Sequence, residues 1–135
     1  MDINLLTAII GLASGAFGYW FTTFSMQPIL RYREIRNKVF SDFIYFAQVT
    51  DAEGLNEDMQ DLYRQRVLSN RTSSANLRAV YLDLPCWYTN HLKSRGLDPE
   101  GAAKSLIGFS NTKDHTASFK LEQKIRGKLG LPTET

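Results

Sequence analysis

The first two dozen residues of the chain form a single uncharged and mostly apolar run. No Asp, Glu, Lys or Arg occurs from Ile3 to Phe24, and the next charged side chain is Arg31. A helix of roughly 22 residues is about 33 Å long, which is enough to cross the hydrocarbon core of a bilayer, about 30 Å thick. The run is too long for a secretory signal and has no basic segment before it, and a buried helix would need a larger partner core than the rest of the chain offers. The pattern therefore predicts a transmembrane anchor over residues 1–27.

After this run the apolar positions recur at helical spacing. From Pro28 to about Thr50 they fall three or four residues apart, at Tyr32, Ile35, Val39, Phe43 and Phe46. A second and longer stripe covers Asn56–Leu84, but its middle is polar. We favour one long helix for this segment, with a break near Thr72–Ser74 as the alternative.

The last third of the chain predicts two shorter helices. Residues 86–96 are expected to form a short connector, in which Trp87 closes the end of the bundle. An acid-proline-acid sequence then predicts a helix over Asp98–Asn111, and the apolar spacing predicts a last helix over Asp114–Leu129. No alternating pattern indicates a strand. The expected fold is all-α, with one N-terminal transmembrane helix followed by a cytoplasmic bundle of about four helices over residues 28–135.

Basic residues follow the apolar run and none precedes it. Four of them occur within eight residues on the C-terminal flank, at Arg31, Arg33, Arg36 and Lys38. Because Lys and Arg are retained on the cytoplasmic side of a membrane, we expect the N-terminus to be outside or periplasmic and the C-terminal domain to be cytoplasmic. The same four side chains are expected to contact anionic lipid headgroups.

Small residues recur along one face of the predicted anchor. They are spaced three, four, three and four residues apart, at Ala8, Gly11, Gly15, Gly18 and Thr22. Gly11 and Gly15 form a G-x-x-x-G pair, which lets two membrane helices approach closely. The alternative is that glycine is simply common in membrane helices. We favour an oligomer interface and therefore expect a homo-oligomer.

Charge and cysteine content restrict the classes of function. The net charge is only +2, which does not point to a nucleic-acid partner. The single cysteine excludes an internal disulfide and suits a reducing compartment. Composition alone therefore indicates neither nucleic-acid binding nor a disulfide-rich extracellular domain.

Cations in the predicted bundle are candidates for contact with an anionic ligand or an acidic protein partner. We single out three arginines of the long helix and two lysines of the last helix, at Arg64, Arg71, Arg78, Lys120 and Lys124. Arg71 and Arg78 are one heptad apart and share a helix face. The alternative is that these charges only solvate the surface of the bundle.

Residues for catalysis or metal binding are few. Cys86 and His91 are the one thiol–imidazole pair close in sequence, but no third residue is evident to orient the imidazole. We expect Cys86 to be a small buried residue. Neither these two residues nor His115 have the spacing of a metal-ligand set, and no phosphate loop or hydrolase motif occurs. We therefore predict no catalytic residue, no metal site and no cofactor.

Three segments resemble a known kind of protein. They are the block Ala103–Asn111 (AKSLIGFSN), the aromatic segment Phe43–Ala47 and the helical segment Leu77-Arg78-Ala79. Together with the uncharged N-terminal run, they resemble a family of small bacterial single-pass inner-membrane proteins of unknown function. The resemblance implies an inner-membrane protein with a cytoplasmic helical domain, and it carries over no catalytic residue.

The expected function is that of a membrane-tethered, non-enzymatic helical interaction module that oligomerises at the inner membrane. The alternative is a signalling or defence effector whose bundle senses a ligand and whose transmembrane helices perturb the membrane. An enzyme is the least favoured of the three classes.

Overall fold

The structure is a computed structural model that describes residues 2–49, 54 and 56–133. No strand occurs among these described residues, so the expected all-helical fold is confirmed. In chain order the elements are α1 (Ile3–Phe21), the π-helical turn η1 (Thr22–Met26), α2 (Gln27–Tyr45), the 3-10 turn η2 (Ala47–Val49), α3 (Glu57–Asp83), α4 (Cys86–Ser94), α5 (Pro99–Asn111) and α6 (His115–Leu129).

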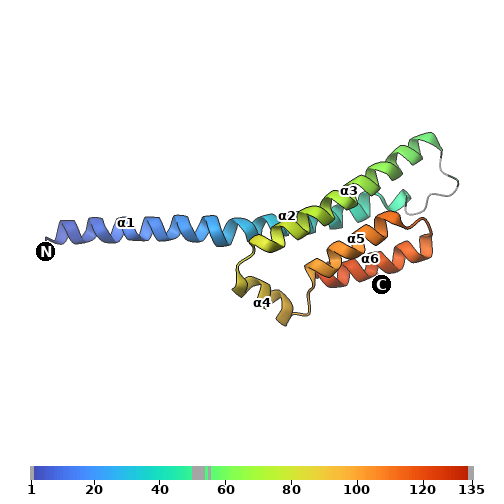
Figure 1. Cartoon of the computed structure of the whole chain (residues 1–135). Helices are drawn as coiled ribbons and strands as arrows, with labels where there is room; N and C mark the ends of the chain where they lie inside the picture. The colour runs from blue at the N-terminus through green and yellow to red at the C-terminus, as the bar shows by residue number, and fades with distance from the viewer. Residues whose placement is uncertain (1, 50–53, 55, 134–135) are drawn as a thin grey trace.

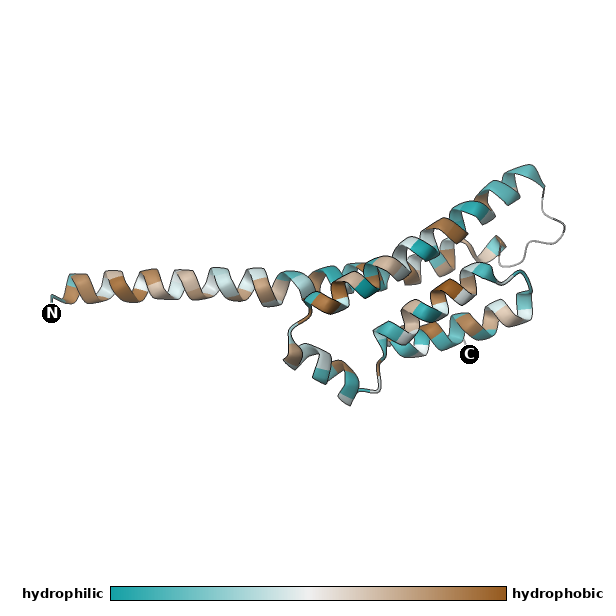
Figure 2. Cartoon of the chain, viewed as in Figure 1, coloured by the Kyte–Doolittle hydropathy of each residue, from teal (hydrophilic) through white to brown (hydrophobic). Residues whose placement is uncertain are grey.

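The first helix projects away from the rest of the chain. Figure 1 shows α1 as a free rod on one side of the bundle, and Figure 2 shows it mostly brown or pale along its length. None of its residues is buried. In the part of the chain that the structure describes, the helix containing α1 is the one long and apolar enough to cross a membrane.

A π-helical turn joins α1 to α2. The N–H of Gln27 donates to the carbonyl oxygen of Thr22, five residues back. Pro28 follows directly, and it has no N–H to donate. The wider turn accommodates this missing donor within a helix, so Ile3–Tyr45 runs as one helix of 43 residues. No break separates the predicted anchor, residues 1–27, from the bundle.

Four helices enclose the hydrophobic core. α3 packs against α5 and α2, and α5 packs against α6. The apolar stripe predicted for α2 is buried at all five of its positions. The predicted helix ends earlier than expected, at Tyr45, and η2 then brings Val49 into the interior; Thr50 lies outside the described residues. Buried core side chains include Tyr32, Val39, Phe43, Leu77, Val80, Leu106, Phe109, Ile125 and Leu129.

The long segment after the turn is a single helix, as we favoured. Asn56 caps α3 by accepting a hydrogen bond from the N–H of Met59 at 2.9 Å. The polar middle of α3 faces the interior and causes no break: Asn70, Ser73 and Ser74 are all buried. Ser74 donates to the carbonyl oxygen of Ala103 at 2.7 Å, which ties α3 to α5. Small polar side chains at this position allow the two helices to pack closely.

The predicted connector at residues 86–96 is wrong in part, because α4 occupies most of it. Tyr88 and Leu92, four residues apart, turn toward the bundle, and Leu92 is buried. Trp87 lies about 100° from Tyr88 around the helix and is 54% exposed, so it does not close the end of the bundle. Cys86 is exposed and not buried as expected.

Capping residues fix the ends of the last two helices. The Asp98 carboxylate accepts from the N–H of Gly101 at 3.0 Å and pairs with Lys128 at 3.1 Å. These contacts, the bond to Gly101 foremost, hold the pKa of Asp98 below its usual value. Asp114 caps α6 through the N–H of Ala117, and Gly130 ends it in the left-handed region at φ 67°.

Candidate functional site

The predicted oligomer face of α1 is open. An ideal Cβ built at Gly11, Gly15 or Gly18 would meet no other heavy atom within 4 Å. The small residues of this face, with Ala8 and Thr22 at its two ends, are exposed and occupy an arc of about 80° around the helix. Nothing in the described chain packs on these glycines, so intramolecular packing does not explain their small size.

The four basic residues after the anchor do not form one patch. Arg31 and Arg33 are exposed on the first turns of α2. Arg36 is half-buried, and Lys38 donates to Asp42 at 2.9 Å and to Ser69 of α3 at 2.7 Å. Lys38 therefore joins α2 to α3, while Arg31 and Arg33 extend from the junction with α1.

A polar hollow lies at this junction. It has a volume of about 210 Å³ and is lined by residues of η1, of α2 and of the last turns of α3: Thr23, Gln27, Pro28, Arg31, Val80 and Asp83. One cation and one anion, Arg31 and Asp83, face the same space. The C-terminal end of α3 is thereby placed beside the end of α2 from which α1 projects.

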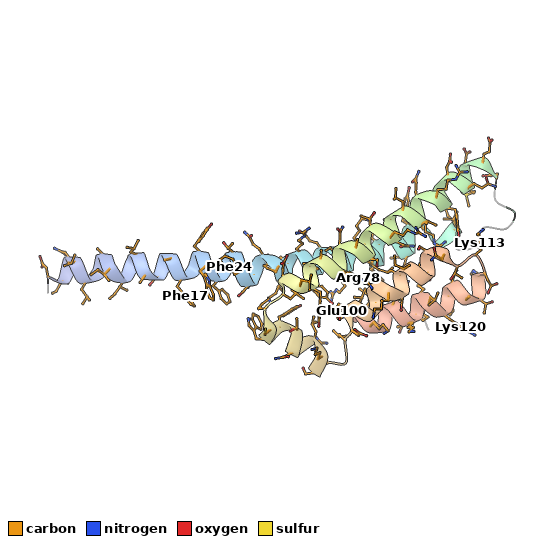
Figure 3. The ribbon with its side chains drawn as sticks, viewed as in Figure 1. Phe17, Phe24, Arg78, Glu100, Lys113 and Lys120 are labelled. Atoms are coloured by element: carbon orange, nitrogen blue, oxygen red, sulfur yellow. The ribbon has the colours of Figure 1, made fainter. Side chains whose placement is uncertain are left out.

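The arginines predicted to bind an anion have different surroundings. Arg64 pairs with Asp61 at 3.3 Å and shares a hollow of about 320 Å³ with Glu57 and Asp58, where an anion would be repelled. Arg71 donates to Asn111 at 2.6 Å. Arg78 is exposed, one heptad further along α3 (Figure 3).

The two predicted lysines lie on another helix. Lys120 and Lys124 are exposed on α6, and α5 lies between α6 and α3 (Figures 1 and 3). Within one chain the lysines and the arginines therefore do not converge on one site.

Two arginines in the core were not anticipated. Arg66 is 1% exposed, its guanidinium lies 4.3 Å from the centre of the Phe109 ring, and its Nη2 donates to the Phe109 carbonyl oxygen at 3.2 Å. Arg126 is 3% exposed and not part of a solvated face. It donates to Glu122 at 2.7 Å and to the carbonyl oxygen of Pro132 at 2.7 Å.

An aromatic pair separates the two buried arginines. The Phe43 and Phe109 rings meet edge to face at 5.4 Å. The Arg126 guanidinium lies 5.5 Å from the centre of the Phe43 ring, and the Arg66 guanidinium lies 4.3 Å from the centre of the Phe109 ring. α2, α3, α5 and α6 thus meet in one cluster, in which contacts run in the order Arg66, Phe109, Phe43, Arg126.

Two hydrogen-bond donors of the Arg66 guanidinium are left without an acceptor in this cluster. Its Nε and Nη1 atoms are buried and have no hydrogen-bond partner among the described residues. Burial lowers the pKa of Arg66. Glu122 is the one buried carboxylate recorded beside the two arginines, so the described core holds more positive than negative charge.

The helical spacing of Arg66 and Arg126 is the sequence signal that could have predicted their burial. Arg66, Asn70 and Ser73 precede Leu77 at intervals of four, three and four residues, which is the spacing of a buried face. Arg126 likewise follows Ile125 and lies three residues before Leu129, both in the core. The sequence analysis did not single out Arg66 or Arg126 as core residues, because charged side chains are mostly exposed.

The thiol–imidazole pair is not assembled. Five residues along an α-helix place Cys86 and His91 about 140° apart around α4 and about 7.5 Å apart along it, and both are exposed. Across the described residues, no group of three or more His, Cys, Asp or Glu side chains could hold a metal ion.

Comparison of the chain with protein-family models, curated proteins and solved structures found no match. The resemblance carried by Ala103–Asn111 therefore stays a prediction. In the structure this block belongs to α5, where Leu106 and Phe109 enter the core. A Cβ at Gly108 would lie 3.9 Å from Leu121 of α6, so Gly108 lies at a helix–helix contact.

Proposed function

We propose that the chain is a membrane-tethered, non-enzymatic interaction module that assembles into homo-oligomers at a bacterial inner membrane. In this proposal α1 crosses the membrane with its N-terminus in the periplasm, and α2–α6 form a cytoplasmic domain. The observation that carries it is the complete exposure of α1, an uncharged helix on which no described part of the bundle packs. In water, exposed apolar surface of this size disfavours a monomer in solution.

The open glycine face supports assembly through α1. Since Gly11, Gly15 and Gly18 meet nothing within the chain, a second α1 can approach their backbone closely. The partners expected in this proposal are a second copy of the chain, anionic lipid near Arg31 and Arg33, and a protein recruited by the exposed surface of the bundle.

Crosslinking of the full-length protein in membranes tests this proposal. Gly15→Leu should reduce the crosslinked oligomer several-fold, because helix contacts of this kind contribute about 1–2 kcal/mol. Ala13→Leu is the matched control: it makes a similar small-to-large change about 160° from Gly15 around the helix and should change the yield less than twofold. Equal losses in the two variants, or extraction of the parent protein without detergent, would contradict the proposal.

A second candidate function is an effector that senses an anionic ligand and acts on the membrane. Two observations favour it: Arg71 and Arg78 share a face of α3, and one helix continues from α1 into the bundle. Membrane depolarisation on overexpression, lost in Arg71→Gln/Arg78→Gln and kept in Arg64→Gln, would support this candidate. Full viability and membrane potential on overexpression would support the interaction module instead.

A further inference from the structure

The exposed side chains of α4 and of Arg95, its C-cap residue, include a large aromatic ring and two cations. Trp87 is 54% exposed, and Lys93 and Arg95 are exposed near the other end of the helix. No Asp or Glu occurs from Leu84 to Leu97. The inward side is fixed by Leu92, which is 4% exposed, so the orientation of α4 is determined by packing.

One contact of α4 and the position of the end of α3 place α4 at the end of the bundle nearest to α1. The Tyr88 ring meets the Tyr32 ring of α2 edge to face at 6.1 Å. The last turns of α3, through Val80 and Asp83, share the junction hollow with Pro28, and α4 begins three residues after Asp83. Figure 1 accordingly shows α4 starting beside the junction of α1 and α2.

This position corresponds to a definite depth if α1 spans a bilayer. A hydrocarbon core of about 30 Å takes up roughly 20 residues from Ile3 onward. The interfacial layer adds several ångströms beyond the core, which brings the level of Pro28 into the headgroup region. α4 begins at about this level, beside the anchor and outside its axis.

The side chains at this end fit a bilayer interface. Trp and Tyr are concentrated at headgroup depth, where an amphipathic ring has both apolar and polar surroundings. Trp87 contacts the neighbouring Tyr88 ring at 5.8 Å and otherwise presents its surface outward. Leu82, in the last turn of α3, is 82% exposed at the same end.

We propose that α4 is a second membrane contact, with Trp87 in the headgroup layer and Lys93 and Arg95 attracted to anionic phospholipid. The occupant of this surface is lipid, because Lys93 of α4 and the adjoining Arg95 are exposed and basic and the anchor holds them within reach of the membrane. The inference rests on the proposed transmembrane role of α1. With α4 seated, the bundle is held at two points and cannot turn freely about the anchor.

Tryptophan quenching in lipid tests the two proposals separately, because the chain has two tryptophans, Trp20 and Trp87. The full-length protein is reconstituted in vesicles of phosphatidylcholine and phosphatidylglycerol brominated near the headgroup or near the chain end. Trp20→Phe then reports Trp87 alone, and Trp87→Phe reports Trp20 alone. We expect shallow bromine to reduce Trp87 emission about twofold, with a smaller effect of deep bromine. Lys93→Gln/Arg95→Gln in the Trp20→Phe background should weaken this quenching.

The outcomes distinguish failure of the proposed second membrane contact from failure of the proposed transmembrane anchor. Quenching of Trp20 without quenching of Trp87 would overturn the second contact and leave the anchor intact, and would indicate that the face is open to a protein. Absence of quenching at both positions would overturn the transmembrane proposal itself.

A second measurement covers the case in which Trp20→Phe fails to insert. Cys86 is the single cysteine and is exposed, so a nitroxide attached there reports depth in the parent protein. Greater relaxation of the nitroxide by oxygen than by a water-soluble nickel complex would support the contact. The reverse order would overturn it.

Discussion

The guanidinium of Arg66 lies on the face of the Phe109 ring, 4.3 Å from its centre, and donates a hydrogen bond to the carbonyl oxygen of the same residue. One side chain of α3 thus binds both the ring and the backbone of one residue of α5. Because α3 and α5 share the most extensive helix contact of the bundle, this pair fixes how the two helices lie against each other.

Two replacements of Arg66 distinguish the effect of its charge on stability from the effect of its volume. Arg66→Met keeps most of the volume and removes a buried, partly unsatisfied cation, so the free energy of unfolding should be unchanged or higher. Arg66→Ala leaves a cavity and should lower it by about 2–4 kcal/mol. Urea unfolding of the full-length protein in detergent, followed by helical circular dichroism, gives both values. A loss in Arg66→Met as large as in Arg66→Ala would show that the charge itself is required.

Asp98 should make stability depend on pH in the acid range. Its pKa is lowered in the folded protein, so its contribution is present above the unfolded pKa and is lost as the pH falls through the folded pKa. Asp98→Ala should cost about 1 kcal/mol at pH 7 through loss of the helix cap. Asp98→Asn should retain most of the cap but show a weaker loss of stability on acidification. An unchanged acid transition in Asp98→Asn would contradict this role.

Tyr32 should make stability depend on pH in the alkaline range. Burial raises its pKa to about 12, whereas an unfolded tyrosine ionises near pH 10. Between these values the unfolded state has lost the proton and the folded state has kept it, so stability falls as the pH rises, by about 1 kcal/mol at pH 11.

Tyr32→Phe should remove this alkaline loss. It should change stability little at pH 8, since the Tyr32 hydroxyl has no hydrogen-bond partner among the described residues. The measurement compares the urea midpoints at pH 8 and pH 11, with Tyr45→Phe, at an exposed position, as the control. An equal alkaline shift in the parent and in Tyr32→Phe would refute the assignment.

Topology reporters test the proposed orientation. An alkaline phosphatase fused to the C-terminus should be inactive, because that enzyme needs the periplasm and the proposed domain is cytoplasmic. Neutral replacement of Arg31, Arg33, Arg36 and Lys38 should weaken the preference, since basic residues set the orientation. High phosphatase activity of the parent fusion would reverse the topology and remove the basis for every cytoplasmic partner.

Sequence patterns located the helices better than they located the polar interior. The helix starts at Asn56 and Asp98 could be predicted because each cap depends on a side chain and a backbone N–H three residues away. α4 was missed because a helix of nine residues buries only Leu92 fully, which leaves no periodic stripe to detect.

The buried cations show what sequence periodicity cannot decide. The helical spacing of Arg66 and Arg126 places them on the buried faces of their helices, but a charged side chain is usually expected to be exposed to solvent. The contacts that offset their burial come from Phe109 and Glu122. Phe109 is 43 residues from Arg66, so this partner is visible only once the helices are packed.

The π-helical turn at Thr22–Met26 determines the angle, around the common helix axis, between the glycine face of α1 and the buried face of α2. It holds one residue more than an α-helical turn, and each residue of a helix turns the chain by about 100°. The glycine face of α1 and the buried face of α2 therefore have an angular offset that this turn defines. Deletion of one residue there would turn the one face relative to the other by about 100° while leaving the apolar length almost unchanged. Because the rod is continuous, torsion about the axis of α1 is transmitted to the bundle, and the arrangement of paired α1 helices dictates which sides of their bundles meet.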